Sequence, residues 1–131
     1  MGQNAELYTK ITRLSDKDRR YRKEAYLFIL AALEYTVDRL QEVRHLSGDE
    51  LSRGIADYAR IQYGFMAQNV LEYWGMKQTL DFGEVVFNLI EVELLRKSDE
   101  DSREDFDGVY EFNAEFTWEK MKPVTFPERF E

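Results

Sequence analysis

Apolar residues recur in the C-terminal half of the chain at the three- and four-residue spacing of a helix: Phe82, Val85, Val86, Leu89 and Ile90. Asp81 precedes this run and Glu84 follows three residues later, so the pair predicts an N-cap and a reciprocal capping box. At about 100° per residue, Glu93 falls in the middle of the apolar stripe, where a lone carboxylate is costly to bury. The helix is therefore expected to end near Glu91 or Val92.

The chain beyond this helix predicts a small β-hairpin. Residues 94–97 would be extended, the polar residues 98–104 would form a turn, and residues 109–112 would return as a strand. The alternative is one continuous helix to Lys97 followed by an irregular acidic loop. We therefore predict a mainly α fold, a single-domain helical bundle with a small C-terminal β-hairpin that is winged-helix-like.

The longest amphipathic pattern predicts a helix from Ser15 or Asp16 to about Val43. Its apolar stripe consists of Ala25, Tyr26, Phe28, Ile29, Ala32, Leu33, Thr36, Val37 and Leu40. Residues 1–15 are expected to form an N-terminal arm with one or two helical turns. The predicted helix opens with a basic cluster, which indicates either a solvated start paired with neighbouring acids or a phosphate-binding patch. The cluster is Lys17, Arg19, Arg20, Arg22 and Lys23.

Two more helices are predicted over residues 48–74. Ser47 and Glu50 form a capping box at the start of the first helix. Gly64 is placed to end that helix in the left-handed conformation, and Gly75 closes the second. A single kinked helix is the alternative, because a glycine inside a helix costs only about 1 kcal/mol.

Length and composition indicate one domain, residues 1–131, with 44% hydrophobic and 15% aromatic residues. The absence of cysteine excludes disulfides, thiolate metal ligands and cysteine nucleophiles. The N-terminal residues lack the apolar region of a secretory signal, and no apolar run approaches the roughly 18 residues that span a bilayer. We expect a cytoplasmic protein with no membrane partner.

The net charge of −8 is distributed unevenly along the chain. Residues 1–46 carry nine basic and seven acidic residues (+2), whereas residues 97–131 carry five and eleven (−6). An acidic surface repels nucleic-acid phosphates, so nucleic-acid binding is disfavoured. In a winged helix, residues 81–92 would be the recognition helix, but they offer carboxylates and no basic residue.

Residues with catalytic or metal-binding chemistry are sparse. His45 is the only histidine, and its neighbour Ser47 lies in no nucleophile elbow, so a surface or cap-associated histidine is expected. The acidic loop at residues 99–107 is the best candidate for a hard cation such as Ca²⁺ or Mg²⁺. It departs from the EF-hand pattern, because Arg103 takes the first ligand position. We assign no catalytic, cofactor-binding or metal residue and expect no cofactor.

Aromatic and acidic residues alternate over residues 113–131, where Pro123 and Pro127 argue against a long terminal helix. These aromatic residues are too apolar for a solvated tail. They should pack back on the core or form an exposed patch that binds a partner. The candidate partner-binding residues are Tyr110, Phe112, Phe116 and Trp118.

Several motifs are distinctive in combination. They are His45-Leu46-Ser47-Gly48, Gly64, Trp74-Gly75, Asp81-Phe82-Gly83-Glu84 with Phe87-Asn88-Leu89, and Asp101-Ser102-Arg103-Glu104-Asp105-Phe106. Together they resemble an uncharacterised conserved family of small bacterial cytoplasmic proteins, over about residues 21–116. The resemblance implies a bacterial, single-domain protein. That family has no assigned activity, so no site residue follows from the likeness.

Elimination leaves protein binding as the expected function, by an adaptor or regulatory module without catalytic activity. Self-association into a homo-oligomer through the same surface is a variant. A winged-helix-like nucleic-acid-binding protein is one alternative. An enzyme or a hard-cation-binding protein that uses residues 99–107 is the other.

Overall fold

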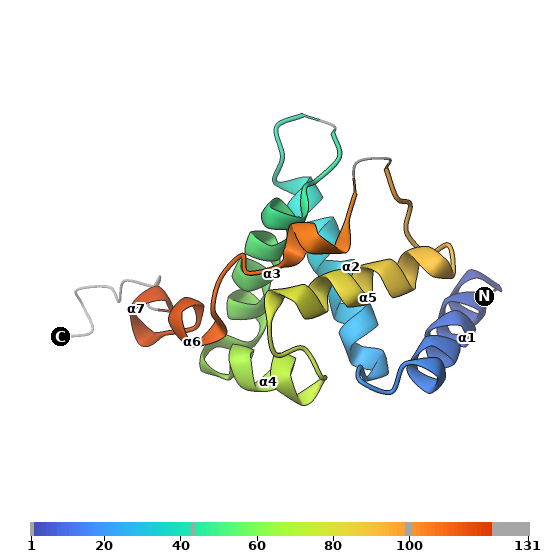
Figure 1. The fold of residues 1–131 in the computed structure, drawn as a ribbon, viewed down its shortest axis with the longest axis horizontal. Coiled ribbons are helices and arrows are strands. Elements are labelled where there is room, and N and C mark those ends of the chain that lie inside the picture. Colours follow the sequence, from blue (N-terminus) through green and yellow to red (C-terminus); the bar gives the residue numbers. More distant parts are fainter. Residues whose placement is uncertain (1, 43, 99–100, 122–131) are drawn as a thin grey trace, which may run out of the picture.

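The structure is a computed structural model that describes residues 2–42, 44–98 and 101–121, and every regular element in these ranges is helical (Figure 1). The elements are α1 (Gly2–Lys17), α2 (Lys23–Asp38), α3 (Gly48–Tyr63), η1 (Gly64–Met66), α4 (Ala67–Tyr73), α5 (Thr79–Glu91), η2 (Arg103–Phe106), α6 (Phe112–Glu115) and α7 (Trp118–Met121), where η denotes a 3-10 helix. None of the described helices is long and apolar enough to cross a membrane.

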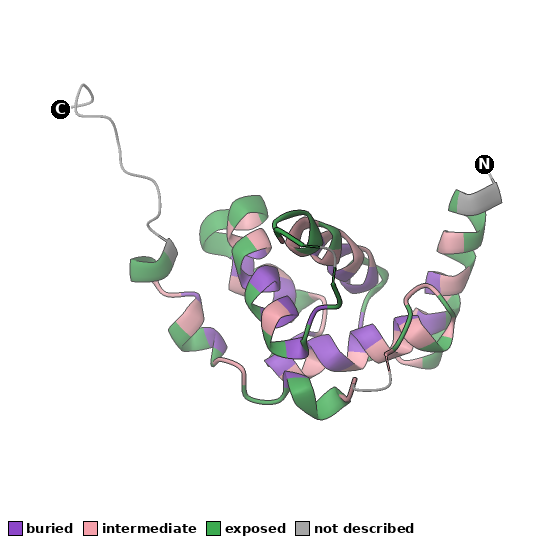
Figure 2. Cartoon of the chain, turned by 90° about the horizontal axis from the view of Figure 1, so that it is seen from above, coloured by how far each residue is buried: buried purple, intermediate pink, exposed green. Residues whose placement is uncertain are grey.

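The core lies between α2, α3 and α5, whose facing surfaces are buried (Figure 2). Tyr26, Ile55 and Phe82 come from these three helices and are fully buried. α2 and α3 cross closely, since a Cβ atom on Gly54 would lie 2.0 Å from the Thr36 hydroxyl oxygen. α1 and the short helices α6 and α7 flank this core at opposite ends of the long axis (Figure 1).

The predicted start of α3 is confirmed. The Glu50 amide donates to the Ser47 hydroxyl at 3.1 Å, and the Ser47 amide donates to the Glu50 carboxylate at 3.0 Å. α3 also ends at Gly64 as predicted, with a positive φ of 52°, although its ψ of −125° differs from a left-handed helical residue. The alternative of one kinked helix through this glycine is therefore excluded.

The predicted boundary between the first two helices is wrong. α1 continues to Lys17, two residues beyond the predicted start of the next helix, and Ile11 and Leu14 on α1 belong to the buried core. The break comes later, where Asp18 accepts a hydrogen bond from the Arg20 amide at 3.2 Å and turns the chain. α2 ends at Asp38, earlier than expected; Val43, the predicted end, lies outside the described residues.

The predicted β-hairpin and the winged-helix-like arrangement are also wrong, because the described residues contain no β-strand. α5 does end at Glu91 as expected. Glu93 then takes a positive φ of 63°, and the Leu94 amide donates to the Leu89 carbonyl at 2.9 Å. This bond folds the chain back against the end of the helix, so residues 94–97 do not start a strand.

The segment expected to return as the second strand is held by other partners. The Val109 amide donates to the Thr79 hydroxyl at 3.1 Å, and the Tyr110 hydroxyl donates to the Ser52 carbonyl at 2.8 Å. Phe112 opens α6. These bonds to α3 and to the start of α5 satisfy the segment without a neighbouring strand.

The start of α5 differs from the prediction by one helical turn. Gln78 is the N-cap, and Asp81 takes the third helical position. The Asp81 carboxylate accepts the amides of Lys77 and Gln78 at 2.8 and 3.2 Å. The sequence signal was therefore right about the capping role of this carboxylate and wrong about its position.

Candidate functional site

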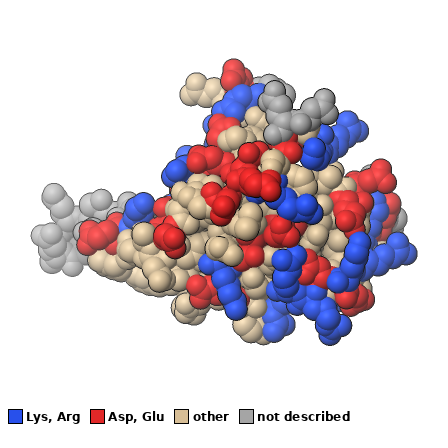
Figure 3. All heavy atoms as spheres, in the orientation of Figure 1, with Lys and Arg blue, Asp and Glu red and all other residues tan. Residues whose placement is uncertain are grey.

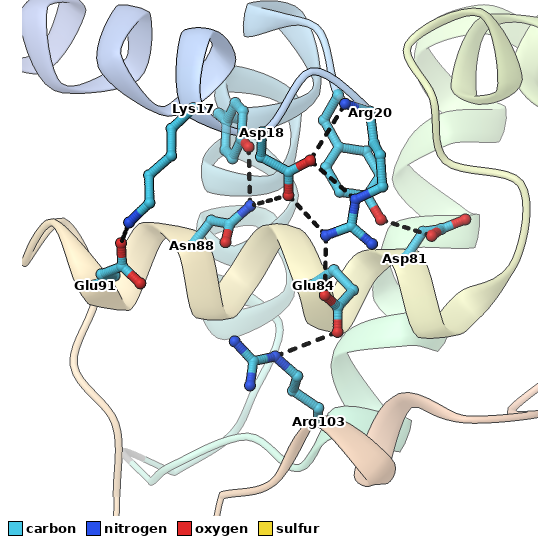
Figure 4. Close-up of polar contacts among 10 residues, drawn as sticks. Lys17, Asp18, Arg20, Asp81, Glu84, Asn88, Glu91 and Arg103 are labelled. Carbon is cyan, nitrogen blue, oxygen red and sulfur yellow. Dashed lines mark hydrogen bonds and ion pairs between the residues drawn. The ribbon is translucent and has the colours of Figure 1, made fainter.

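A polar network on α5 joins this helix to the α1–α2 connector and to η2 (Figure 4). Glu84 lies at its centre and pairs with Arg20 at 3.1 Å and with Arg103 at 3.2 Å. Asp18 pairs with Arg20 at 2.7 Å and accepts a hydrogen bond from the Asn88 amide group at 3.0 Å. Each of these charges has an opposite partner, which is typical of a structural cross-link rather than of a catalytic site.

The same contacts shift the protonation of two groups. The Arg20 guanidinium holds the pKa of the Asp18 carboxyl at about 2; partial burial opposes this effect and the bond from Asn88 supports it. Burial raises the pKa of the Tyr21 hydroxyl, and its 2.6 Å hydrogen bond to Asp81 raises it further. Tyr21 therefore stays a neutral donor that anchors the connector to α5.

The Asp18→Asn variant should be less stable at neutral pH by roughly 1–2 kcal/mol, after allowance for solvent screening of the exposed Arg20. The native pKa lies below the ordinary value of 3.8, so the stabilisation is present above about pH 4 and is lost as the pH falls towards 2. Urea unfolding of both proteins from pH 7 to pH 2 measures this. A difference in unfolding free energy between the wild type and Asp18→Asn that does not shrink on acidification would contradict this prediction. Asp16→Asn is the control, because Asp16 is an exposed neighbour of Asp18.

Basic side chains gather at the lower right of the molecule, over α1 and the connector that follows it (Figure 3). Arg19, Arg22, Lys23 and Lys77 line an open groove of about 860 Å³ there. Arg22 is held in place, because its Nε donates to the Tyr73 carbonyl at 3.1 Å and its guanidinium lies 4.2 Å from the Tyr73 ring centroid. Acidic side chains line the same groove. The mixed surface favours a solvated helix start over a phosphate-binding patch.

His45 lies where the α2–α3 connector meets the segment after α5. Its Nε2 is 2.8 Å from both carboxylate oxygens of Asp101, which also accepts the Ser98 amide at 2.8 Å. Burial raises the pKa of Asp101, but the Ser98 amide and His45 outweigh it and leave the pKa below its ordinary value. The Ser47 hydroxyl caps α3 and does not bond to His45. These contacts form no Ser–His–Asp triad.

A pocket opens beside His45, which we call the His45 pocket. Its apolar part has a volume of about 240 Å³ and is walled by α2, α3, α5, η2 and the connectors. The lining residues are Leu33, Val37, Arg44, His45, Leu46, Ser47, Gly48, Leu51, Val86, Phe87, Ile90, Leu95, Arg96, Asp101, Asp105 and Phe106. A polar cleft of about 380 Å³ also includes His45 and Asp101 in its lining. An apolar interior with a few polar groups at one side is the usual form of a small-molecule site.

The acidic loop does not form a metal site in the part that the structure describes. No group of three or more His, Asp or Glu side chains there is arranged to hold an ion. Asp101 is bound to His45, Asp105 accepts the Ser102 amide at 3.1 Å, and Arg103 pairs with Glu84 on α5. The first two acids of the loop, at positions 99 and 100, lie outside the described residues.

Three of the four predicted partner-binding side chains pack against the protein itself. Phe112 and Phe116 are 4% and 9% exposed, and their ring centroids are 5.4 Å apart. Tyr110 is half-buried, and its hydroxyl donates to the Ser52 carbonyl. Only Trp118 is largely exposed, at 57%. Part of the aromatic C-terminal segment is therefore core and Trp118 is surface, while residues 122–131 lie outside the described residues.

The structure adds an exposed residue that the sequence pattern did not single out. Phe65 on η1 is 68% exposed and stacks on Trp118, with ring centroids 5.0 Å apart and an interplanar angle of 12°. Ile61 and Met66, close to it in the chain, are also exposed. Sequence reasoning could have found Phe65 from its position directly after Gly64, the glycine that ends α3. A residue beyond the end of the helix is not part of the helix's buried stripe.

The described fold and surface define a small helical protein with an exposed aromatic pair and a partly apolar pocket beside His45. Comparisons with protein-family models, with curated proteins and with solved structures found no match to this chain. The resemblance to an uncharacterised bacterial family therefore stays a prediction, and the function must be argued from the site itself.

Proposed function

We propose that the protein is a protein-binding module whose contact surface is the Phe65–Trp118 pair. One observation carries this proposal: two large aromatic side chains stack face to face while each remains more than half exposed. Water-exposed aromatic surface is costly, and a partner that covers it recovers the hydrophobic free energy. Tryptophan and other aromatic residues at the centre of an interface commonly carry most of the binding energy.

The charge beside the pair indicates the chemistry of the partner. Residues 111–119, which lead up to and include Trp118, contain three carboxylates, and one of them, Glu115, is paired with Arg60 and Lys120. Glu111 and Glu119 are exposed there. A surface of this kind attracts a basic segment and repels an acidic one. The proposed partner is a protein segment with a bulky apolar side chain flanked by lysine or arginine, and binding should weaken as salt rises.

The test is selection from a peptide library that varies both charge and apolar content, in the presence of nuclease. Peptides with a large apolar residue between basic residues should be enriched. Phe65→Ala and Trp118→Ala should each weaken the selected peptides by about tenfold or more, as expected for an aromatic anchor. Isothermal titration calorimetry gives the affinities, because its signal does not depend on Trp118.

Tyr8→Ala is the matched control. Tyr8 is 57% exposed, as Trp118 is, but it lies on α1 at the other end of the molecule (Figure 1). Its replacement should leave peptide affinity unchanged. Enrichment of acidic peptides, or equal losses in all three variants, would contradict the proposal. Self-association that depends on Trp118, seen by light scattering, would replace it with the homo-oligomer variant.

A further inference from the structure

Core side chains form the interior of the His45 pocket, and this pocket is not part of the proposed protein-binding surface. Val86 and Leu51, which line it, are 8% and 5% exposed, and Phe106 is 5% exposed. The wall is therefore formed by ordered core side chains rather than by surface groups. A cavity of about 240 Å³ lined in this way disfavours water and favours an apolar ligand.

Some charged groups at the mouth of the pocket already have a hydrogen-bond or ion-pair partner in the protein, and others do not. Arg44 is held by Glu50 through two hydrogen bonds of 2.8 and 2.6 Å. Asp101 is occupied by His45. Arg96 also lines the pocket, is exposed, and makes no ion pair with any residue of the described ranges.

The acids at the mouth do not offer a matching site for a cationic ligand. Asp105 caps η2 by accepting the Ser102 amide, and its backbone lies against Gly48, where a Cβ atom would approach its carbonyl oxygen to 3.0 Å. Gly48, the first residue of the 16-residue helix α3, lines the pocket, and the acids Asp49 and Glu50 follow it in the first turn of that helix. Asp101 and Asp105 remain carboxylates at the mouth, and Arg96 is the cationic group there that has no ion pair among the described residues.

We propose that the His45 pocket binds a small monocarboxylate, with its apolar body inside the cavity and its carboxylate paired with Arg96. The cavity volume sets the size of the body. A cavity of about 150 Å³ is known to hold a benzene ring, so about 240 Å³ accommodates a substituted ring or a short acyl chain. Guanidinium and carboxylate form strong, directional pairs, which would select an acid over the corresponding alcohol.

His45 makes the proposal directly testable, because it is the only histidine in the chain and so gives unambiguous imidazole resonances. The full-length protein is titrated with hexanoate, hexanol and acetate at constant ionic strength and pH, and two-dimensional NMR spectra are recorded. Hexanoate should cause saturable shifts of the His45 ring and of the Val86 and Leu51 methyl groups. Hexanol should bind about tenfold more weakly, and acetate should not saturate.

Two variants that each remove one positive charge distinguish a direct contact between Arg96 and the carboxylate from a general electrostatic attraction. Arg96→Gln should weaken hexanoate binding by about tenfold and leave hexanol unaffected. Lys97→Gln, at the exposed neighbouring position outside the pocket lining, should have no effect on either. Leu95→Trp should abolish the shifts by filling the cavity. If this variant does not fold, the three-ligand comparison on the wild-type protein still decides.

Two results would overturn the inference. The first is the absence of saturable shifts at His45 and Val86 with hexanoate up to its solubility limit. The second is equal binding of hexanoate and hexanol together with equal behaviour of Arg96→Gln and Lys97→Gln, which would leave a plain apolar cavity. Neither result bears on the Phe65–Trp118 pair, so this proposal and the protein-binding proposal can fail separately.

Discussion

The Gly75→Ala variant should lose at least about 3 kcal/mol of folding free energy. Gly75 ends α4 with a φ of +103°, a conformation that L side chains rarely adopt. A Cβ atom there would lie 1.9 Å from the Arg20 carbonyl oxygen, which belongs to the backbone and cannot rotate away. The Arg22 amide donates to the Trp74 carbonyl at 3.0 Å, so relief of the clash would also break the contact between α4 and the α1–α2 connector.

Gly108→Ala is the matched control for this substitution. Gly108 also has a positive φ, of 61°, but a Cβ atom added there would have no neighbouring atom within 4 Å. The conformational cost alone is about 1 kcal/mol. Urea unfolding followed by circular dichroism measures both variants. Equal losses would mean that the contact between Gly75 and Arg20 contributes nothing beyond backbone strain.

The Phe112→Ala variant should lose about 3 kcal/mol of stability, because it empties a packed site in the core. Phe112 is 4% exposed, and its ring centroid lies 5.7 Å from that of Phe82 and 5.4 Å from that of Phe116. Trp118→Ala should lose less than about 1 kcal/mol, because its ring is 57% exposed and, among the described aromatic residues, stacks on Phe65 alone. Thermal and urea unfolding of the two variants measure this difference.

The Phe112 and Trp118 variants separate the two alternative roles that were expected for the aromatic C-terminal segment, packing on the core and binding a partner. Phe112 should affect stability, and any loss of partner binding in that variant should follow the fraction of unfolded protein. Trp118 should affect binding while stability is nearly unchanged. A stable Phe112→Ala protein that no longer binds peptide would place Phe112 in the contact surface after all.

Several short-range signals were read correctly from the amino-acid sequence, although the start of α5 was placed one helical turn too late. The capping box of Ser47 and Glu50 involves residues three positions apart, so its hydrogen bonds form within one helical turn whatever the rest of the chain does. The end of α5 at Glu91 followed from the cost of burying Glu93, and Glu93 is indeed exposed. The first half of the predicted α2 stripe also agrees with its period, since Ala25, Ile29 and Ala32 are fully buried, whereas Val37 near its end is 43% exposed.

Errors arose where partners distant in the chain decide the structure. The segment from Val109 to Phe112 has the composition of a strand, but Thr79 and Ser52 satisfy its polar groups from 30 and 58 residues away. The burial of Phe112 and the exposure of Trp118 likewise depend on where α6 and α7 meet α3 and η1. Alternation of aromatic and acidic residues carries no information on that geometry.

The sequence alone was sufficient for the helical class, the capping of α3, the end of α5 and the acidic charge, because these depend on neighbouring residues or on composition. The tertiary structure decided which charges pair around Glu84, which aromatic side chains remain exposed, and that His45 and Asp101 meet beside an apolar cavity. His45 and Asp101 are 56 residues apart. Their contact depends on the packing of α3 against α5 and η2, and no local pattern contains it.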